Sequence, residues 1–497
     1  VSPNDPDAAL LARQAIDAVQ SGDEFYELRL AVLLTDTSLK RLDARAARLV
    51  NAYESTLAFS RLEGQQMEAL EFFSAIEHPA LGTRSATSAH SFVLGSALPV
   101  AFGGLGGVVN RVAPDGVYIG FRSGLNAQPL GPVHWSPFSD SNRAAHVGFL
   151  GQIGSGKTVG MSALLARFRA TEGTPIVFLE PIGNSARLAA LLERDPGLRF
   201  HRLDWETLRL NPLDWIPETL VIADGLSEQE SHVETILEVM LGRRLDNLEK
   251  GFLARALQMI YRGFSPDALE DPAQAPRLEL LCDALAAFRH EPYGEAADRL
   301  SHQVAGKFVD GGLGRTFNAA TGLPLAFDGA DLFDASAVAG TDSGNRAMQQ
   351  IVYYAIFAWF LRVARRDRRQ GRRVRRIFAV DEYYALSQSA YLKERLNLMV
   401  RTLRNLHTSV WVAEQTLSTF AGADEKSLIA NVPYWFVFRQ ERIEADLAPD
   451  VFGRRCPAQF VDVLPQLPQG VAVALLDQTL LLQLSLLRLE YDTLVKG

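Results

Sequence analysis

Residues 151–158 read GQIGSGKT and match the phosphate-binding pattern G-x-x-x-x-G-K-[ST] at every specified position. The apolar residues 146–150 before this loop predict a buried strand, and residues 159–168 after it predict an apolar-periodic helix. Strand, glycine turn and helix form the arrangement in which backbone N–H groups and a helix N-terminus face phosphate oxygens. A chance glycine-rich turn would not be expected in this context, so the sequence predicts a nucleoside triphosphate site.

The chemistry of the loop assigns roles to its residues. We expect Lys157 to reach the β- and γ-phosphates and the Thr158 hydroxyl to hold Mg²⁺. The cofactors that this predicts are ATP and Mg²⁺. The predicted nucleotide-binding residues are Gly151, Gln152, Ile153, Gly154, Ser155, Gly156, Lys157, Thr158 and Val159.

Two later strand ends complete the predicted site. Residues 377–380 form an apolar strand that ends in Asp381 and Glu382, and residues 409–413 form another that leads to Gln415. Asp381 is suited to the metal and its water shell, and Glu382 to polarising the attacking water. Gln415 can sense the γ-phosphate or align that water. A strand that simply ends in two acids is the alternative, and the pairing with the loop argues against it.

An arginine supplied to a neighbouring subunit's nucleotide is a further expected catalytic group. Arg404 is the first candidate, followed by Arg401, Arg439 and Arg442. For each of them the alternative is an ordinary arginine at a surface or helix end, because the chain is rich in arginine.

Size and composition bound the class of protein. A chain of 497 residues with 47% apolar and 22% charged residues predicts two to three soluble globular domains. The net charge of −8 argues against a polyanion-binding surface over the whole molecule, and two cysteines fit a reducing, cytosolic compartment. Residues 91–109 are uncharged, but Pro99 and five glycines favour a buried loop and strand region over a membrane helix. The start at Val1 indicates a domain boundary rather than a natural terminus.

The periodicity predicts two parts, a front α/β domain with connecting strands over 1–142 and a nucleotide domain over 143–497. The nucleotide domain is expected to be a mostly parallel α/β sheet with an all-helical insertion at about 225–310. Expected helices cover 7–20, 39–57, 347–363 and 393–403. Expected strands cover 24–34, 116–121, 133–135, 175–179, 198–203, 324–327, the region of Leu332, and 434–438.

Nine arginines lie between the end of the helix at 347–363, which includes the first of them, and the strand at 377–380. They are Arg362, Arg365, Arg366, Arg368, Arg369, Arg372, Arg373, Arg375 and Arg376. One interpretation is a contact with DNA or an acidic partner. The other is a solvated helix end, where cations are favourable, and the acidic net charge of the chain favours this second interpretation.

These motifs together resemble the conjugative-transfer and type IV secretion ATPases of the TraC/TrbE type, the fourth component of the VirB system. In the front part the resemblance rests on residues 24–32 (EFYELRLAV), 65–66 (QQ), 72–74 (FFS) and 78–79 (HP). In the nucleotide domain it rests on 151–158, 211–214 (NPLD), 317–318 (FN), 381–382 (DE), 404–405 (RN), Gln415 and 467–470 (LPQG). Departures are Glu180-Pro181 in place of Asp-Pro and Tyr383-Tyr384 in place of Ala-Trp, and part of the family's front domain is absent.

The resemblance implies a RecA/FtsK-like motor domain that works as a homohexamer. It implies a peripheral location at the cytoplasmic face of the inner membrane, with membrane-embedded secretion or conjugation subunits as partners. Contact with DNA is compatible with the resemblance but is not required by it. Two alternatives share the motifs: a DNA translocase of the FtsK/HerA kind or a conjugative coupling protein, and an assembly scaffold that binds ATP with little turnover.

Overall fold

The computed structural model describes residues 25–28, 87–90, 116–123, 129–139 and 144–496, apart from positions 182, 184, 324–325, 339–342, 388, 423–424, 458 and 477–478. The chain divides into two compact units, Val1–Gly103 and Gly104–Gly497. In the first unit, β1 (Phe25–Leu28) pairs antiparallel with β2 (Thr87–His90), and β1 falls within the strand expected at 24–34. The features expected at 7–20, 39–57 and 91–109 lie outside the described residues.

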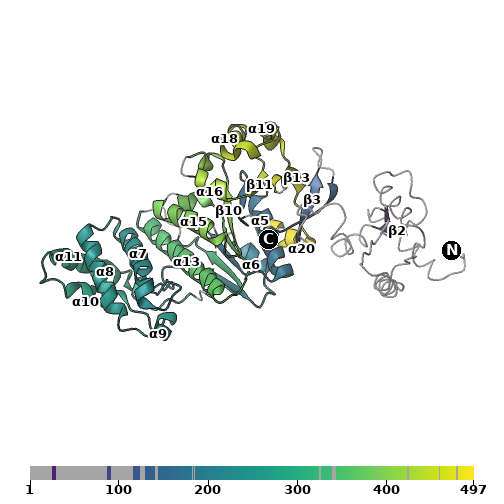
Figure 1. Ribbon diagram of the computed structural model, residues 1–497. Coiled ribbons are helices and arrows are strands. Elements are labelled where there is room, and N and C mark those ends of the chain that lie inside the picture. Colours follow the sequence, from purple (N-terminus) through teal and green to yellow (C-terminus); the bar gives the residue numbers. More distant parts are fainter. Residues whose placement is uncertain are drawn as a thin grey trace, which may run out of the picture. The chain divides into compact units, whose positions relative to one another are not determined.

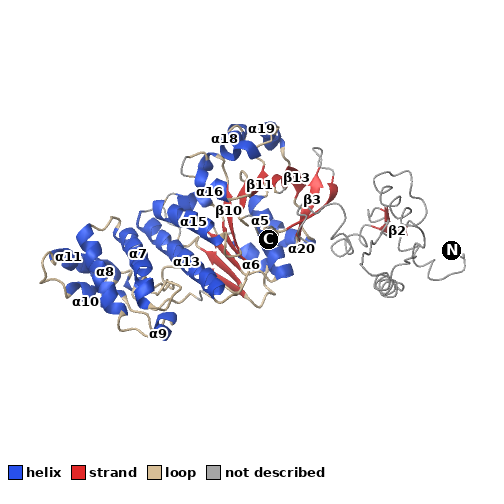
Figure 2. Cartoon of the chain, viewed as in Figure 1, coloured by secondary structure: helices blue, strands red, loops and turns tan. Residues whose placement is uncertain are grey.

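The second unit is built on one sheet of eleven strands (Figures 1 and 2). In spatial order the strands are β4 (Pro129–Trp135), β3 (Val117–Ser123), β13 (Thr479–Gln483), β12 (Val471–Leu475), β11 (Tyr434–Phe438), β5 (Val147–Leu150), β10 (Thr408–Glu414), β9 (Arg376–Val380), β6 (Ile176–Glu180), β8 (Ala330–Asp334) and β7 (Leu198–Arg202). The seven strands from β11 to β7 are parallel, and the other four are antiparallel. The parallel α/β sheet that the sequence predicts is therefore confirmed, with an antiparallel extension.

The central strands are apolar on both faces because helices cover both. Every residue of β5, β6, β9, β10 and β11 is buried, as expected for parallel strands packed between helical layers. On one face α5 (Lys157–Glu172) and α6 (Ser185–Leu191) share a core with the strands. On the other, α13 (Ser343–Arg369) and α15 (Ala390–Leu403) belong to a second, larger core.

The insertion between β7 and β8 is helical, as the sequence predicts. Its main helices are α7 (Ile222–Leu241), α8 (Asn247–Tyr261), α9 (Pro266–Glu270), α10 (Leu278–Ala286) and α11 (Glu295–Phe308), and they lie beyond one end of the sheet in Figure 1. The chain segments that lead into and out of the insertion are joined by backbone bonds, with the Leu210 N–H donating to the Thr316 carbonyl at 2.8 Å. The insertion is therefore joined to the sheet by two chain segments that are hydrogen-bonded to each other.

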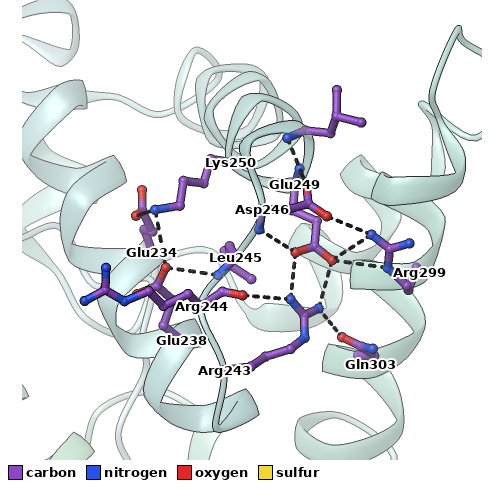
Figure 3. A network of polar contacts seen from close by, with 11 residues as sticks. Glu234, Glu238, Arg243, Arg244, Leu245, Asp246, Glu249, Lys250, Arg299 and Gln303 are labelled. Atoms are coloured by element: carbon purple, nitrogen blue, oxygen red, sulfur yellow. Dashed lines mark hydrogen bonds and ion pairs between the residues drawn. The ribbon is translucent and has the colours of Figure 1, made fainter.

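A polar network fixes the corner between α7 and α8 (Figure 3). The Asp246 side chain caps α8, and the buried Glu249 carboxylate accepts two bonds from Arg243 at 2.7 and 2.8 Å. Arg299 of α11 reaches the same carboxylate at 3.3 Å. A buried carboxylate is costly unless it is paired and hydrogen-bonded, and Glu249 is both, so this corner ties three helices of the insertion together.

Two features differ from the sequence expectations. The strand expected at 324–327 is absent at its described positions, because Ala326 and Phe327 lie outside any strand and Phe327 has a left-handed backbone, φ 49°. The Phe327 ring is buried against Phe333 and Phe360. A sequence pattern does not distinguish a residue buried in this way from an apolar residue of a strand. The connecting strands at 116–121 and 133–135, grouped in the sequence with the front domain, are β3 and β4 of the main sheet.

No helix in the described part of the chain combines the length and the hydropathy needed to cross a membrane.

Candidate nucleotide-binding site

The glycine-rich loop joins β5 to α5 at the carboxyl edge of the parallel strands. Gly156 has φ 101°, a conformation that L side chains rarely adopt, and it forms the N-terminal boundary of α5. A Cβ at Gly151 would lie 2.4 Å from the Ser155 hydroxyl oxygen and 2.8 Å from Cβ of Phe438, so only glycine fits there. The loop therefore leads from β5 directly into the N-terminus of α5, the end of a helix that favours phosphate oxygens.

Three neighbouring segments hold the loop by its backbone. The Gly151 N–H donates to the Glu414 carbonyl and the Gln152 N–H to the Arg439 carbonyl, each at 3.1 Å. The Gly470 N–H donates to the Ser155 carbonyl at 2.9 Å. These contacts come from the ends of β10 and β11 and from the start of β12, so the sheet positions the loop from both sides.

Lys157, Thr158, Asp381 and Glu382 converge, as the sequence predicts for strand ends of one parallel sheet. The Lys157 ammonium lies 3.5 Å from Asp381 Oδ1 and 3.4 Å from Glu382 Oε1. The Thr158 hydroxyl donates to Asp381 Oδ2 at 3.1 Å. One cation and two carboxylates thus lie directly beside the loop, separated in sequence by more than two hundred residues.

The environments of the two acids differ. Burial raises the pKa of the Asp381 carboxyl above its usual range, while the Lys157 ammonium opposes this shift. Glu382 is partly exposed and has φ 59°, a strained conformation for a residue other than glycine. Such strain persists where the surroundings determine the backbone, and the Glu382 N–H is held by Asp381 Oδ1 at 3.1 Å.

Gln415 lies against Glu382 at the end of the neighbouring strand. Its amide nitrogen is 2.8 Å from both Glu382 Oε1 and Oε2. The backbone carbonyl of Gln415 in turn accepts a bond at 3.2 Å from the side-chain amide of Gln440, which is buried. The structure therefore brings Gln415 to the position that the sequence predicts, with its amide aimed at the carboxylate.

Glu414 is a residue of the site to which sequence reasoning assigns no role. Its buried carboxylate accepts the Tyr384 N–H at 2.6 Å and the Gln415 N–H at 2.7 Å, and burial raises its pKa. It joins the segment after Glu382 to the segment that carries Gln415. The signal in the sequence was its place beside Gln415 at a strand end, but its partners are backbone groups, which no side-chain pattern reveals.

The four candidate arginines lie in two different places. Arg404 follows α15 and precedes β10, and because β10 is parallel to β5 this places it, with Arg401, at the edge opposite the loop. Arg439 follows β11 and lies beside the loop, where its carbonyl accepts from Gln152. Arg442 pairs with Asp446 at 3.1 Å and with Asp462 at 2.9 Å. Arg404 and Arg401 are therefore not brought to the loop of their own chain.

The donor set of the site suits Mg²⁺. No cluster of three or more His, Cys, Asp or Glu side chains that could hold a metal occurs among the described residues. Mg²⁺ is commonly bound through one or two protein oxygens together with phosphate oxygens and water, and the adjacent Thr158 hydroxyl and Asp381 carboxylate supply that number.

Fold and loop together define the class: the second unit is a RecA-like P-loop domain with a helical insertion. Its overall structure is similar to that of VirB4 of Thermoanaerobacter pseudethanolicus, with a TM-score of 0.60 and 18% identity over 78% of this chain and 100% of that chain. The bacterial conjugative coupling protein TrwBdeltaN70 also aligns, with a TM-score of 0.43 and 12% identity over 74% of this chain and 90% of that chain. No protein-family model matches the sequence, and a search of curated proteins finds no significant match. The likeness to VirB4 shows a common fold, and it confirms the fold that the sequence resemblance implies.

Proposed function

We propose that this protein is an ATPase, and that it serves as a motor of a type IV secretion or conjugative-transfer apparatus. The observation that carries the ATPase proposal is the convergence of Lys157, Glu382 and Gln415 beside the glycine-rich loop. A phosphate cradle alone would support binding. A carboxylate oriented by an amide at its edge supports hydrolysis.

The residues divide the work as follows. The loop N–H groups and α5 hold the phosphates, and Lys157 moves from its two carboxylates to the β- and γ-phosphate oxygens. Thr158 and Asp381 would hold Mg²⁺, which supplies charge neutralisation at the phosphates. Glu382 accepts hydrogen bonds from the attacking water, and Gln415 orients both the carboxylate and the water. Glu414 keeps the two segments that carry these groups in register.

The motor proposal draws on the sequence resemblance and on the fold shared with VirB4. In this proposal the working form is a homohexamer at the cytoplasmic face of the membrane, docked on membrane-embedded subunits. An arginine of one subunit, Arg404 in the first place, would then act at the nucleotide of its neighbour, which is consistent with its distance from its own loop.

Replacement of Lys157 by Ala tests the site. We expect Lys157→Ala to reduce steady-state ATP hydrolysis at least 100-fold, because the γ-phosphate loses its main cation. Lys307→Ala is the control, since Lys307 is exposed on α11 and has no ion pair among the described residues. Unchanged hydrolysis by Lys157→Ala would refute the site assignment.

Images of the purified protein with ATP and Mg²⁺ test the motor. Six-fold rings, and loss of transfer or secretion in cells that carry Lys157→Ala, are the expected results. Duplex DNA that accelerates hydrolysis many-fold and in a salt-sensitive way would favour a DNA translocase instead. Tight ATP binding with negligible turnover would favour an assembly scaffold.

A further inference from the structure

A strongly basic surface lies at the edge of the sheet opposite the phosphate loop. We call it the arginine edge, and it comprises the exposed residues Arg368, Arg369, Arg372, Arg373 and Arg375. These residues occupy the end of α13 and the turn that leads into β9. Since β9, β10 and β5 are parallel, the arginine edge is about 17 Å from the loop, the length of a five-residue strand. It is therefore a separate surface from the nucleotide site.

The arginine edge is hollowed. A cavity of about 410 Å³ is lined by Arg368, Arg372, Arg373 and Arg376, and by residues 405–407 between α15 and β10. A second cavity of about 400 Å³ adjoins it and shares Arg368 and Leu406. A concave surface of this kind lets several guanidinium groups contact one ligand at once.

The acids near the arginine edge do not neutralise it. Asp367 is the only acidic side chain that lines the first cavity, and its two oxygens already pair with Arg372, at 2.6 Å, and with Arg376. The side chains of Arg368 and Arg373 have no ion pair or hydrogen bond within the described part of the chain. At least two full positive charges thus face the cavity without a counter-charge.

The other two exposed arginines of the edge each have one carboxylate within ion-pair distance. Arg369 pairs with Glu218 at 3.0 Å and Arg375 approaches Glu172 at 3.6 Å. The carboxyl ends of α13 and α15 also attract cations, but a helix terminus carries only about half an elementary charge. The partial negative charge of the helix ends therefore makes arginine favourable at these positions. It is too small to neutralise the positive charge of the surface.

The composition of the surface selects the kind of partner. None of the exposed large apolar side chains belongs to residues 364–376 or 402–407. Protein partners usually engage an apolar patch with aromatic anchors, and membrane-surface segments insert apolar residues. Nucleic-acid interfaces are polar and strongly positive, and a guanidinium group can donate two hydrogen bonds to the oxygens of one phosphate.

We propose that the arginine edge binds the phosphate backbone of a nucleic acid, with Arg368 and Arg373 as the principal contacts. Contacts to phosphate oxygens carry no direct sequence information, so we expect the binding to be independent of base sequence. The contact does not involve the nucleotide of the same chain, because the cavity and the phosphate loop occupy opposite edges of the sheet.

The test is binding of a fluorescein-labelled 30-base-pair DNA duplex to the full chain without nucleotide, followed by fluorescence anisotropy over a series of salt concentrations. We expect Arg368→Gln/Arg373→Gln to weaken binding about tenfold. The slope of log K against log salt should fall by about two, one for each lost phosphate contact. The matched control is Arg262→Gln/Arg454→Gln, which removes two exposed arginines that have no ion pair among the described residues. It should bind as the wild type does.

Unchanged binding by the Arg368/Arg373 double variant would overturn the proposal, as would an equal loss in the control. Preferential binding of a poly-glutamate peptide, not displaced by the duplex, would reassign the surface to an acidic protein. Retention on vesicles of phosphatidylserine with no duplex binding would reassign it to a membrane. Lys157→Ala should bind the duplex as the wild type does. The outcome of this test is therefore independent of the ATPase proposal.

Discussion

The side-chain amide nitrogen of Gln415 lies 2.8 Å from both carboxylate oxygens of Glu382. The two residues come from the ends of adjacent strands, β10 and β9. An amide that bridges both oxygens fixes the plane of the carboxylate. The backbone of Gln415 is held in turn by the side chains of Glu414 and Gln440. This relationship places an oriented base beside Lys157.

Glu382→Gln should separate binding from chemistry. The amide keeps the size of the side chain but cannot take up a proton, so we expect kcat for ATP to fall at least 100-fold. The affinity for ATP should remain within about threefold, because the loop and Lys157 hold the phosphates. Glu441→Gln, an exposed position, is the control. A variant with more than a third of wild-type kcat would exclude Glu382 as the base.

Gln415→Ala should have a smaller effect on the same step. The carboxylate stays in place but loses the donor that orients it, so we expect kcat to fall by about 10- to 100-fold with little change in KM. Gln466→Ala, which alters an exposed glutamine, should be unaffected. A rise in KM at constant kcat would instead assign Gln415 to nucleotide binding.

The sequence predicts the core of this site because a parallel sheet brings its strand ends together. Once residues 146–150, 377–380 and 409–413 are identified as parallel strands of one sheet, the groups that follow them must meet at one edge. By the same argument Arg404 belongs at the other edge, because it precedes its strand. Glu414 escaped prediction since it acts on the N–H groups of Tyr384 and Gln415, and backbone partners leave no mark in the sequence.

The limits of the fold prediction have a similar origin. Apolar runs predict the parallel strands because burial on both faces leaves few polar residues in them. The apolar pattern predicts a strand at Phe327 because a buried aromatic residue gives the same signal outside a strand, where Phe327 lies with a left-handed backbone. β3 and β4 belong to the main sheet because β3 pairs with β13, which is far away in the sequence. Local periodicity does not reveal such long-range pairing.

Glu414→Ala should destabilise the protein as well as slow it. Two N–H groups at partly buried positions would lose their acceptor, and each such loss costs about 1–3 kcal/mol. We therefore expect the free energy of unfolding to fall by about 2–4 kcal/mol in urea titrations, together with a loss of kcat. Glu193→Ala removes an exposed carboxylate and should leave both quantities unchanged. Wild-type stability in Glu414→Ala would show that Tyr384 and Gln415 are held in some other way.

Asp214 makes the stability of the insertion's connectors depend on pH. Its buried carboxyl accepts a bond from the Thr321 hydroxyl, so it links the segment that leads into the insertion to the segment that leads out. Burial raises the pKa of Asp214 to about 7, although the nearby Arg277 and Arg362 oppose the shift. In the unfolded chain the pKa is about 4. The folded state therefore retains a proton that the unfolded state releases, and the stability present below pH 4 is lost as the pH rises towards 7.

Asp214→Asn removes this dependence, because an amide does not ionise. The free energy of unfolding of the variant minus that of the wild type should increase between pH 5 and pH 7, by on the order of 2 kcal/mol, since each pH unit contributes about 1.4 kcal/mol. Urea titrations at the two pH values measure this difference, and any constant effect of the amide cancels. Asp450→Asn, at an exposed position, should give the same difference at both pH values. If Asp214→Asn also gives a constant difference, the carboxyl of Asp214 is ionised in the folded protein at pH 5, and the connectors are not pH-sensitive at this residue.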